Sequence, residues 1–202
     1  DRFLSLKSYV DGTHENNRTL KISADTESTK PDLFLLGGSS SSAQFAAENK
    51  VNFIFAHFIK NDESLLKEVS AAYKKQYPDG KFIAALSVLA AETEAEKRAA
   101  AEENKVYSLK FKDGKTLRVT TENQVNDYIR NTDEKIEVEK KQLDMIIGNK
   151  EEILSKLDDL SKVSPIDEFM FHIPSTDAEI RNQTVKILAP IHTIHKEKAG
   201  IL

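Results

Sequence analysis

The sequence has no cysteine among its 202 residues, which excludes disulfide bonds, thiol catalysis and cysteine-ligated zinc. It also has no apolar run long enough to cross a bilayer, and it opens without the pattern of a signal peptide. From these absences, and from a composition that suits a reducing compartment, we predict a cytoplasmic protein that does not insert into a membrane.

The chain also has no long cluster of charge of one sign. It carries 29 lysines and arginines against 33 acidic residues, a net charge of -4, and the two signs are interleaved. This pattern offers no basic surface for nucleic acid. With 39% hydrophobic residues the chain can build a core, so we predict a single domain over residues 1–202. Because the chain starts at Asp1 and not at methionine, we expect further sequence upstream.

Neither a P-loop nor a GxGxxG motif is present, but one stretch still favours an anion. In PDLFLLGGSSSSAQFAA, residues 31–47, the apolar run over residues 33–36 predicts a strand buried on both faces. An apolar helix begins at Ala43, and Gly37 and Gly38 between the two elements allow a close approach to the backbone. A strand, a glycine turn and a helix start in this order predict a binding site at the end of the strand.

Four serines occupy the predicted start of that helix, namely Ser39, Ser40, Ser41 and Ser42. Free backbone N–H groups and the helix dipole favour a phosphate at such a position, and serine hydroxyls can donate to it or cap the helix. The alternative is a solvated loop that ends in an ordinary N-cap. The pattern indicates an anion near a helix N-terminus and does not say which anion.

Three more apolar runs predict strands, over residues 51–58, 82–90 and 166–173. Helices are predicted between and after the strands, and each begins at a capping signal. These signals are Asp62, Thr93 with Glu96, Asn149, and Thr176 with Glu179. The alternation of buried strands and helices predicts an α/β fold with a parallel sheet.

One region interrupts this alternation. Asp113-Gly114 sits between two alternating segments, which predicts a β-hairpin and defines an insertion over residues 105–120. After it we expect two helices, over residues 122–130 and 136–147. A further short amphipathic helix is predicted near the start of the chain, over residues 3–10.

Three stretches together resemble the bacterial luciferase-like, flavin-dependent monooxygenase family. They are LFLLGGSSSSAQFAA followed by FIFAHF, then FIAALSVLAAETEAEKRAA, and last MIIGNKEEILSKL with DEFMFHIPSTDAEIRNQTVKILA. Their order and spacing are similar to the C-terminal half of the family, over roughly residues 31–190. The resemblance implies the second half of a (β/α)8 TIM-type barrel. A closed barrel needs about eight strands, and only the four apolar runs described above predict buried strands in this chain.

The resemblance also implies a function, the oxidation of a small organic substrate with O2 and reduced FMN, with a flavin reductase as a candidate partner. In such enzymes the loop after the fifth barrel strand contacts the FMN phosphate. That role would fall on Gly38, Ser39 and Ser42, with the N–H groups of Ser40 and Ser41 between them. Some relatives have an acidic residue in place of Gly38, so its contact would be through the backbone. The family's catalytic residues belong to the first four strands, so none is assigned here, and the resemblance implies that the isolated chain does not assemble a complete active site and can be inactive.

Two histidines stand at the carboxyl ends of predicted strands, where barrels build their active sites. His57 and His172 are therefore candidates for the vicinity of the flavin or substrate. The alternative for each is a histidine packed at a strand end with one nitrogen satisfied. Asp167 lies at the opposite end of its strand, where it would serve stability. We predict no metal site, because no further ligands converge on His192 and His195.

Two other functions stay open. The chain could be a non-catalytic half-barrel that self-associates or binds a phosphorylated ligand, or an ordinary open α/β domain whose phosphate ligand is unrelated to flavin. A sheet cut from a barrel would expose an apolar flank and two strand edges. We therefore expect a homo-oligomer, such as a dimer.

Overall fold

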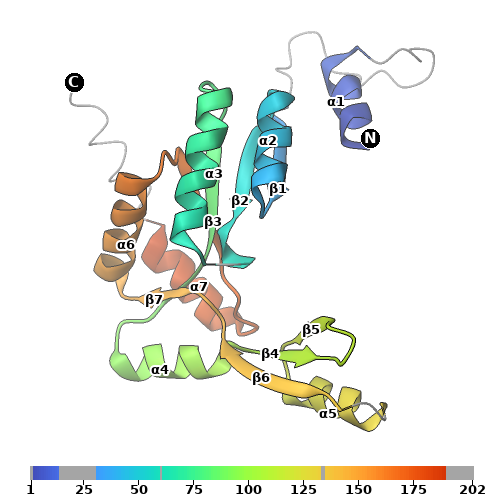
Figure 1. The fold of residues 1–202 in the computed structure, drawn as a ribbon. Coiled ribbons are helices and arrows are strands. Elements are labelled where there is room, and N and C mark those ends of the chain that lie inside the picture. The colour runs from blue at the N-terminus through green and yellow to red at the C-terminus, as the bar shows by residue number, and fades with distance from the viewer. Residues whose placement is uncertain (1, 14–30, 60, 133–134, 190–202) are drawn as a thin grey trace.

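The computed structural model describes residues 2–13, 31–59, 61–132 and 135–189, and its centre is a five-stranded sheet (Figure 1). The strands are β1 (Phe34–Gly37), β2 (Asn52–Ala56), β3 (Phe82–Ala90), β7 (Ile146–Gly148) and β8 (Glu168–His172). All pairings among them are parallel. The predicted α/β class with a parallel sheet is therefore confirmed.

β3 is the central strand of this sheet. All 9 of its residues are buried, which explains why every residue of this strand except Ser87 is apolar. β2 pairs with its first half, and β8 pairs with Ile83–Ser87. The end of β3, Val88–Ala90, pairs with the short β7. β1 pairs with β2 and completes the order β1-β2-β3-β8.

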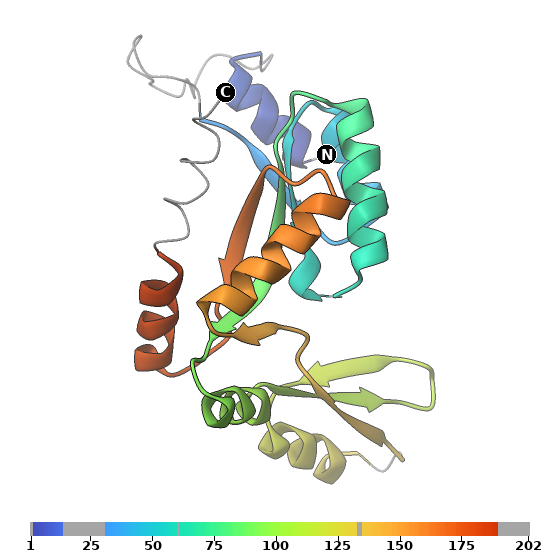
Figure 2. The ribbon, with the colours of Figure 1, turned by 90° about the vertical axis from the view of Figure 1, so that its left-hand side faces the viewer.

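Helices cover one face of the sheet (Figure 2). They are α2 (Ser40–Glu48), α3 (Glu63–Gln76) and α6 (Lys150–Val163). Their apolar stripes pack on side chains that alternate along the strands, with Phe53, Phe55 and Phe82 in the middle of the core. The 3-10 turn η1 (His57–Ile59), after β2, and α7 (Ala178–Leu188), after β8, both contact β3, and α1 (Arg2–Asp11) contacts α2 through the rings of Phe3 and Phe45.

The opposite face of the sheet is only partly covered. Side chains that point away from the helices include Leu36 on β1, which is 58% exposed, and Met170 on β8, which is 44% exposed. The prediction that residues 33–36 form a strand buried on both faces is therefore wrong for the described residues. β1 lies at an edge of the sheet, and α2 and α3 cover only the face to which Leu35 contributes.

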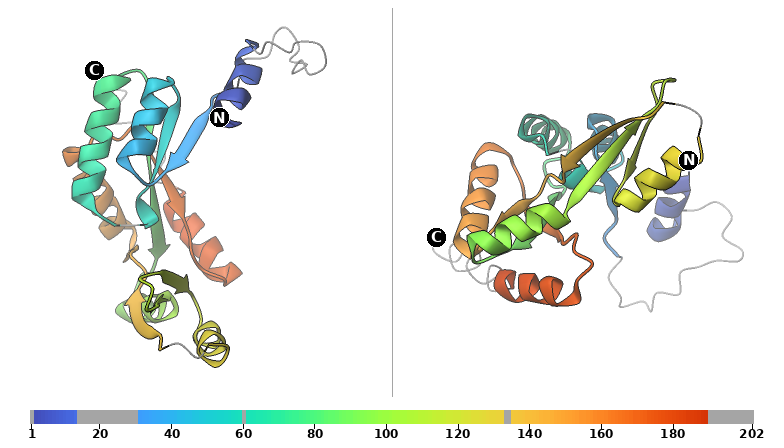
Figure 3. Two further views of the ribbon diagram at one scale, coloured as in Figure 1. Left: turned by 45° about the vertical axis from the view of Figure 1, so that its right-hand side comes forward. Right: turned by 90° about the horizontal axis from the view of Figure 1, so that it is seen from below.

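The chain between β3 and β7 forms a separate small sheet with a helix on either side of its hairpin in sequence (Figure 3). Its elements are α4 (Glu94–Glu103), β4 (Lys105–Lys110), β5 (Thr116–Val119), α5 (Glu122–Arg130) and β6 (Glu137–Gln142). The predicted hairpin is confirmed, since β4 and β5 pair antiparallel across Asp113-Gly114. The helix predicted over residues 122–130 is also confirmed. Tyr107, Leu109 and Val125 contribute to a small core of its own.

The helix predicted over residues 136–147 is wrong. The chain forms β6 there, antiparallel to β4, and then β7 in the main sheet. The hairpin leaves one edge of β4 free, and β6 satisfies the backbone groups along that edge. Sequence periodicity missed this strand because its apolar residues are few and the pairing partner is distant in sequence.

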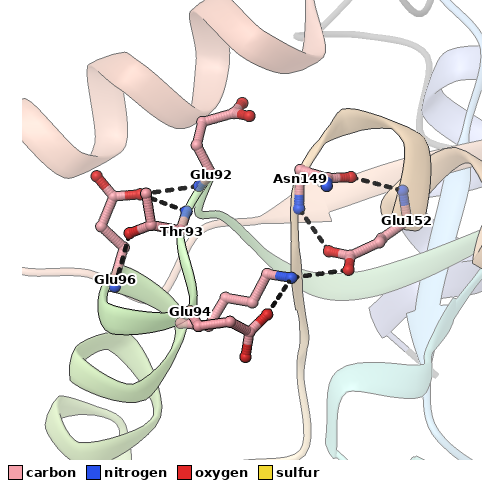
Figure 4. Close-up of polar contacts among 7 residues, drawn as sticks. Glu92, Thr93, Glu94, Glu96, Asn149 and Glu152 are labelled. Carbon is pink, nitrogen blue, oxygen red and sulfur yellow. Dashed lines mark hydrogen bonds and ion pairs between the residues drawn. The ribbon is translucent and has the colours of Figure 1, made fainter.

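The helices begin as the capping signals predicted, with one exception. Thr93 caps α4 and Asn149 caps α6, each in a capping box with a glutamate three residues on (Figure 4). Lys97 joins the two helix starts, with its Nζ 2.9 Å from Glu94 and 2.7 Å from Glu152. The capping box predicted at Thr176 is wrong, because the N-cap of α7 is the next residue, whose carboxylate accepts from two backbone N–H groups.

Candidate functional site

The serine tract forms the turn between β1 and α2. Ser39 is the N-cap of α2, and its hydroxyl accepts a hydrogen bond from the Ser42 N–H at 3.2 Å. The same hydroxyl lies 2.6 Å from the Ser42 hydroxyl and 3.0 Å from the Ser41 hydroxyl. The N–H groups of Ser40 and Ser41 open the helix and have no partner inside it. The hydroxyl of Ser39 is therefore engaged in capping, whereas the N–H groups of Ser40 and Ser41 remain as donors at the surface.

The two glycines of this turn have different roles. A Cβ on Gly37 would stand 2.5 Å from Cβ of Ser42, so the side chain of Ser42 needs glycine at this position. A Cβ on Gly38 would have ordinary contacts, with Ile59 Cδ1 at 3.7 Å. Gly38 is exposed, as are Ser39 and Ser40. The backbone at Gly38 is thus open to a ligand on the outer side of the turn.

Charge also distinguishes this helix start. The first turns of α1 and α2 contain no acidic residue, whereas the first turns of α3, α4, α5, α6 and α7 each contain at least one. Those carboxylates already neutralise the positive ends of their helices, and α2 has no such group of its own. A carboxylate oxygen of Glu68, on α3, lies 3.5 Å from the Ser40 hydroxyl. It is the acidic group that an incoming anion would meet.

His57 is buried on the helix-covered side of the sheet. It is 2% exposed, and its ring lies 6.0 Å from that of Phe55, a residue of the main core. Neither ring nitrogen has a hydrogen-bond partner among the described residues. The sequence left two alternatives for His57, a histidine near a ligand and a packed histidine with one nitrogen hydrogen-bonded. The structure places His57 among core side chains with both nitrogens unsatisfied.

Burial lowers the pKa of His57 from its usual value of 6.5, because the charged ring would lose its hydration. Asn61, which lies near the ring without completing a hydrogen bond, and the carboxylates of Glu63 and Asp62 oppose this shift without cancelling it. Lys156 adds to the lowering. His57 is therefore a neutral ring held in the core.

His172 has a different environment, at the end of β8 on the partly covered face. It is exposed, and its Nδ1 lies 3.1 Å from the hydroxyl of Ser87, a residue of β3 that is 4% exposed. The ring of Phe58, in η1, is 5.3 Å away at an angle of 39°. Of the two histidines predicted near a ligand, His172 is the one that reaches the open side of the strand ends.

Sequence reasoning missed Ser87 and Phe58. Ser87 is the one polar residue of β3, and a hydroxyl inside an otherwise apolar strand is a usable signal for a buried polar contact. Its partner is 85 positions away, so no local pattern identifies the pair. Asp167 lies at the opposite end of β8, where it accepts from the Phe82 N–H at 2.6 Å and pairs with Lys74. Its role is structural.

Within the described ranges, no three histidine, aspartate or glutamate side chains gather where they could share a metal ion. His192 and His195 lie outside the described residues. None of the helices in the described parts of the chain is both long and apolar enough to span a bilayer.

Comparison with known proteins gives two informative matches. Over 165 residues the chain is 34% identical to N-acetyl-S-alkylcysteine monooxygenase of Bacillus subtilis strain 168, an alignment that covers 79% of this chain and 49% of that protein. The crystal structure of apo-MsnO8 shares the fold, with a TM-score of 0.63 and 20% identity over 93% of this chain and 58% of that one. No protein-family model matches the chain.

A further solved structure, flavoprotein 390, reaches a TM-score of only 0.46 at 15% identity, over 88% of this chain and 76% of that chain. That likeness is too low to establish a shared fold. The chain is a relative of the luciferase-like monooxygenases, the family that its sequence resembles. It spans about half the length of the curated monooxygenase that it matches.

Proposed function

We propose that this chain is the FMN-phosphate side of a flavin-dependent monooxygenase that oxidises a small organic substrate with O2. The observation that carries the proposal is the start of α2, a serine-capped helix N-terminus without an acid of its own, at the carboxyl end of β1. Parallel α/β sheets bind ligands at the carboxyl ends of their strands, and helix N-termini bind phosphate. Monooxygenase chemistry is supported by the curated relative.

The residues of the turn fit a phosphate. Gly38 would offer its backbone, Ser40 and Ser41 their free N–H groups, and the exposed serine hydroxyls further donors. Bound reduced FMN would supply the electrons with which O2 is activated. The chain's own part would be to hold the phosphate end in place and so fix the position of the ring.

The half-barrel is part of the same proposal. The order β1-β2-β3-β8 would correspond to consecutive strands of a (β/α)8 barrel, and the partly covered face with Leu36 and Met170 to its interior. The substrate class that we propose is a small thioether, because the curated relative is a monooxygenase of N-acetyl-S-alkylcysteine. A flavin reductase would provide reduced FMN.

One experiment tests binding and turnover together. The chain is incubated with FMN, freed of unbound flavin, and then supplied with NADH, a flavin reductase, O2 and N-acetyl-S-methylcysteine. The proposal predicts a yellow protein from this chain, and oxygenated thioether by mass spectrometry when the chain is part of a complete barrel, because the family's catalytic residues belong to the first four strands. Protein that stays colourless would contradict it.

The carboxylate of Glu68, near the serine tract, allows a more specific test of where the phosphate binds. Replacing Glu68 by Gln removes a negative charge beside the proposed phosphate, so FMN should bind about two- to fivefold more tightly, the range of an exposed charge interaction. Glu48→Gln, at the far end of α2, is the matched control and should leave the affinity unchanged. Equal effects of the two changes would place the phosphate elsewhere.

A non-catalytic half-barrel is the second candidate, and one observation favours it. Leu36 and Met170 expose apolar surface on the partly covered face, opposite α2, α3 and α6. Such a face is suited to a second copy of the chain. FMN retained by a self-associated chain, with no turnover when the complete protein is assayed, would support this alternative.

A further inference from the structure

The pair Ser87 and His172 stands apart from the serine tract and has no part in the function proposed so far. Both residues point to the face of the sheet opposite the helices, and they are direct partners in the register of β3 and β8. Ser87 is nearly inaccessible, whereas His172 is exposed. The buried hydroxyl of Ser87 thus contacts one nitrogen of the His172 ring, and the other side of that ring is exposed.

The contact constrains the ring in two ways. The 3.1 Å bond from Nδ1 to the Ser87 hydroxyl fixes the orientation of the imidazole and occupies Nδ1. The ring of Phe58, 5.3 Å away, restricts its rotation. Nε2 is then the nitrogen that remains for a ligand.

η1 links this pair to the serine tract. The site for a Cβ on Gly38 lies 3.7 Å from Ile59, and the preceding residue, Phe58, contacts His172. β1 and β8 are three strand steps apart, which is at most roughly 14 Å at the usual strand spacing. The carboxyl edge of the sheet therefore has a phosphate-type site at one end and a hydrogen-bonding ring at the other.

We propose that His172 is a hydrogen-bonding residue for the end of the ligand remote from its phosphate, and that Ser87 is the residue that positions it. This inference rests on the proposed function. FMN has its phosphate at one end of a ribityl chain and a heteroaromatic ring at the other, so it needs polar groups at two separated points.

The first test concerns the ring itself and needs no ligand. In protein with 15N-labelled histidine, at a pH where the ring is neutral, the two ring nitrogens of His172 should have the separate shifts of one fixed tautomer. Ser87→Ala should move both shifts toward the average of a free imidazole, and Ser87→Thr, which keeps the hydroxyl, should restore them. The change Ser108→Ala, at another buried strand serine, is the control and should move neither. Identical spectra for the Ser87→Ala and unchanged proteins would overturn the positioning role.

The second test follows the same signals during titration with FMN and with inorganic phosphate. FMN should shift Nε2 of His172 together with the backbone amides of Ser39–Ser42, whereas phosphate alone should shift only the amides. Ser87→Ala should weaken the binding of FMN about fivefold, which corresponds to the loss of one hydrogen bond, and should leave the binding of phosphate unchanged. If FMN moves the serine amides and not His172, this inference fails and the proposed function stands. If FMN moves neither, the proposed function fails and this inference with it.

Discussion

Gly37 shows at the scale of one residue how the serine turn is built. A Cβ there would meet the side chain of Ser42 at 2.5 Å, so Gly37→Ala must displace the turn. We expect a loss of about 1–3 kcal/mol in the free energy of unfolding and weaker FMN binding. Gly38→Ala is the matched control, because its Cβ has only ordinary contacts, and thermal unfolding of both variants makes the comparison. Equal stability of the two variants would show that the turn is not tightly packed.

His57 gives a prediction about pH. Its pKa in the folded chain lies below the usual 6.5, so below about pH 6.5 the unfolded chain binds a proton that the folded chain does not. This contribution to stability is complete above pH 6.5 and is lost as the pH falls from there toward the folded pKa, with a slope of at most about 1.4 kcal/mol per pH unit. Urea unfolding at pH 7.5 and 5.5 measures it.

The variants His57→Phe and His57→Gln remove the titrating ring and should lose less stability than the unchanged chain between those two pH values. A pH dependence of His57→Phe and His57→Gln equal to that of the unchanged chain would show that His57 does not cause the effect.

At the scale of single elements, the N-cap in the first turn of α6 should contribute measurably to the stability of the chain. The N-cap Asn149 accepts from the Glu152 N–H at 2.9 Å, and the helix contributes Ile153, Leu157 and Leu160 to the main core. Asn149→Ala should cost about 1 kcal/mol in the free energy of unfolding. Asn149→Ser keeps an acceptor and should cost much less, as measured by denaturant titration. Equal losses would mean that capping does not set the stability of α6.

Local patterns predicted the elements whose signals are contained in their own sequence. The apolar run of β3, the Asp113-Gly114 turn and the caps at Thr93 and Asn149 all belong to this group. They did not predict β6, whose residues become a strand only because β4 presents a free edge. They also did not pair Ser87 with His172, because that contact depends on the register of β3 against β8. Long-range pairing, and not propensity, determined what was missed.

For the whole molecule, the partly covered face makes self-association the expected behaviour of this chain by itself, without the rest of the proposed barrel. Leu36 and Met170 are exposed there, on strands at two edges of the main sheet. The double change Leu36→Lys with Met170→Lys should shift sedimentation velocity toward monomer, because it places charge in an apolar contact. Val163→Lys alters an equally exposed apolar residue at the end of α6 and should not change association. A monomeric unchanged chain would contradict the expectation.

The central claim is that a phosphate binds at the start of α2, and a comparison of FMN with riboflavin tests it most directly. The two molecules differ only in the phosphate, and charge-assisted hydrogen bonds contribute roughly 1.5–3 kcal/mol each. By isothermal titration, FMN should therefore bind at least about tenfold more tightly than riboflavin. Ser39→Ala should reduce that difference, and Ser70→Ala, in the core side of α3, should preserve it. Equal affinity for FMN and riboflavin would contradict the account.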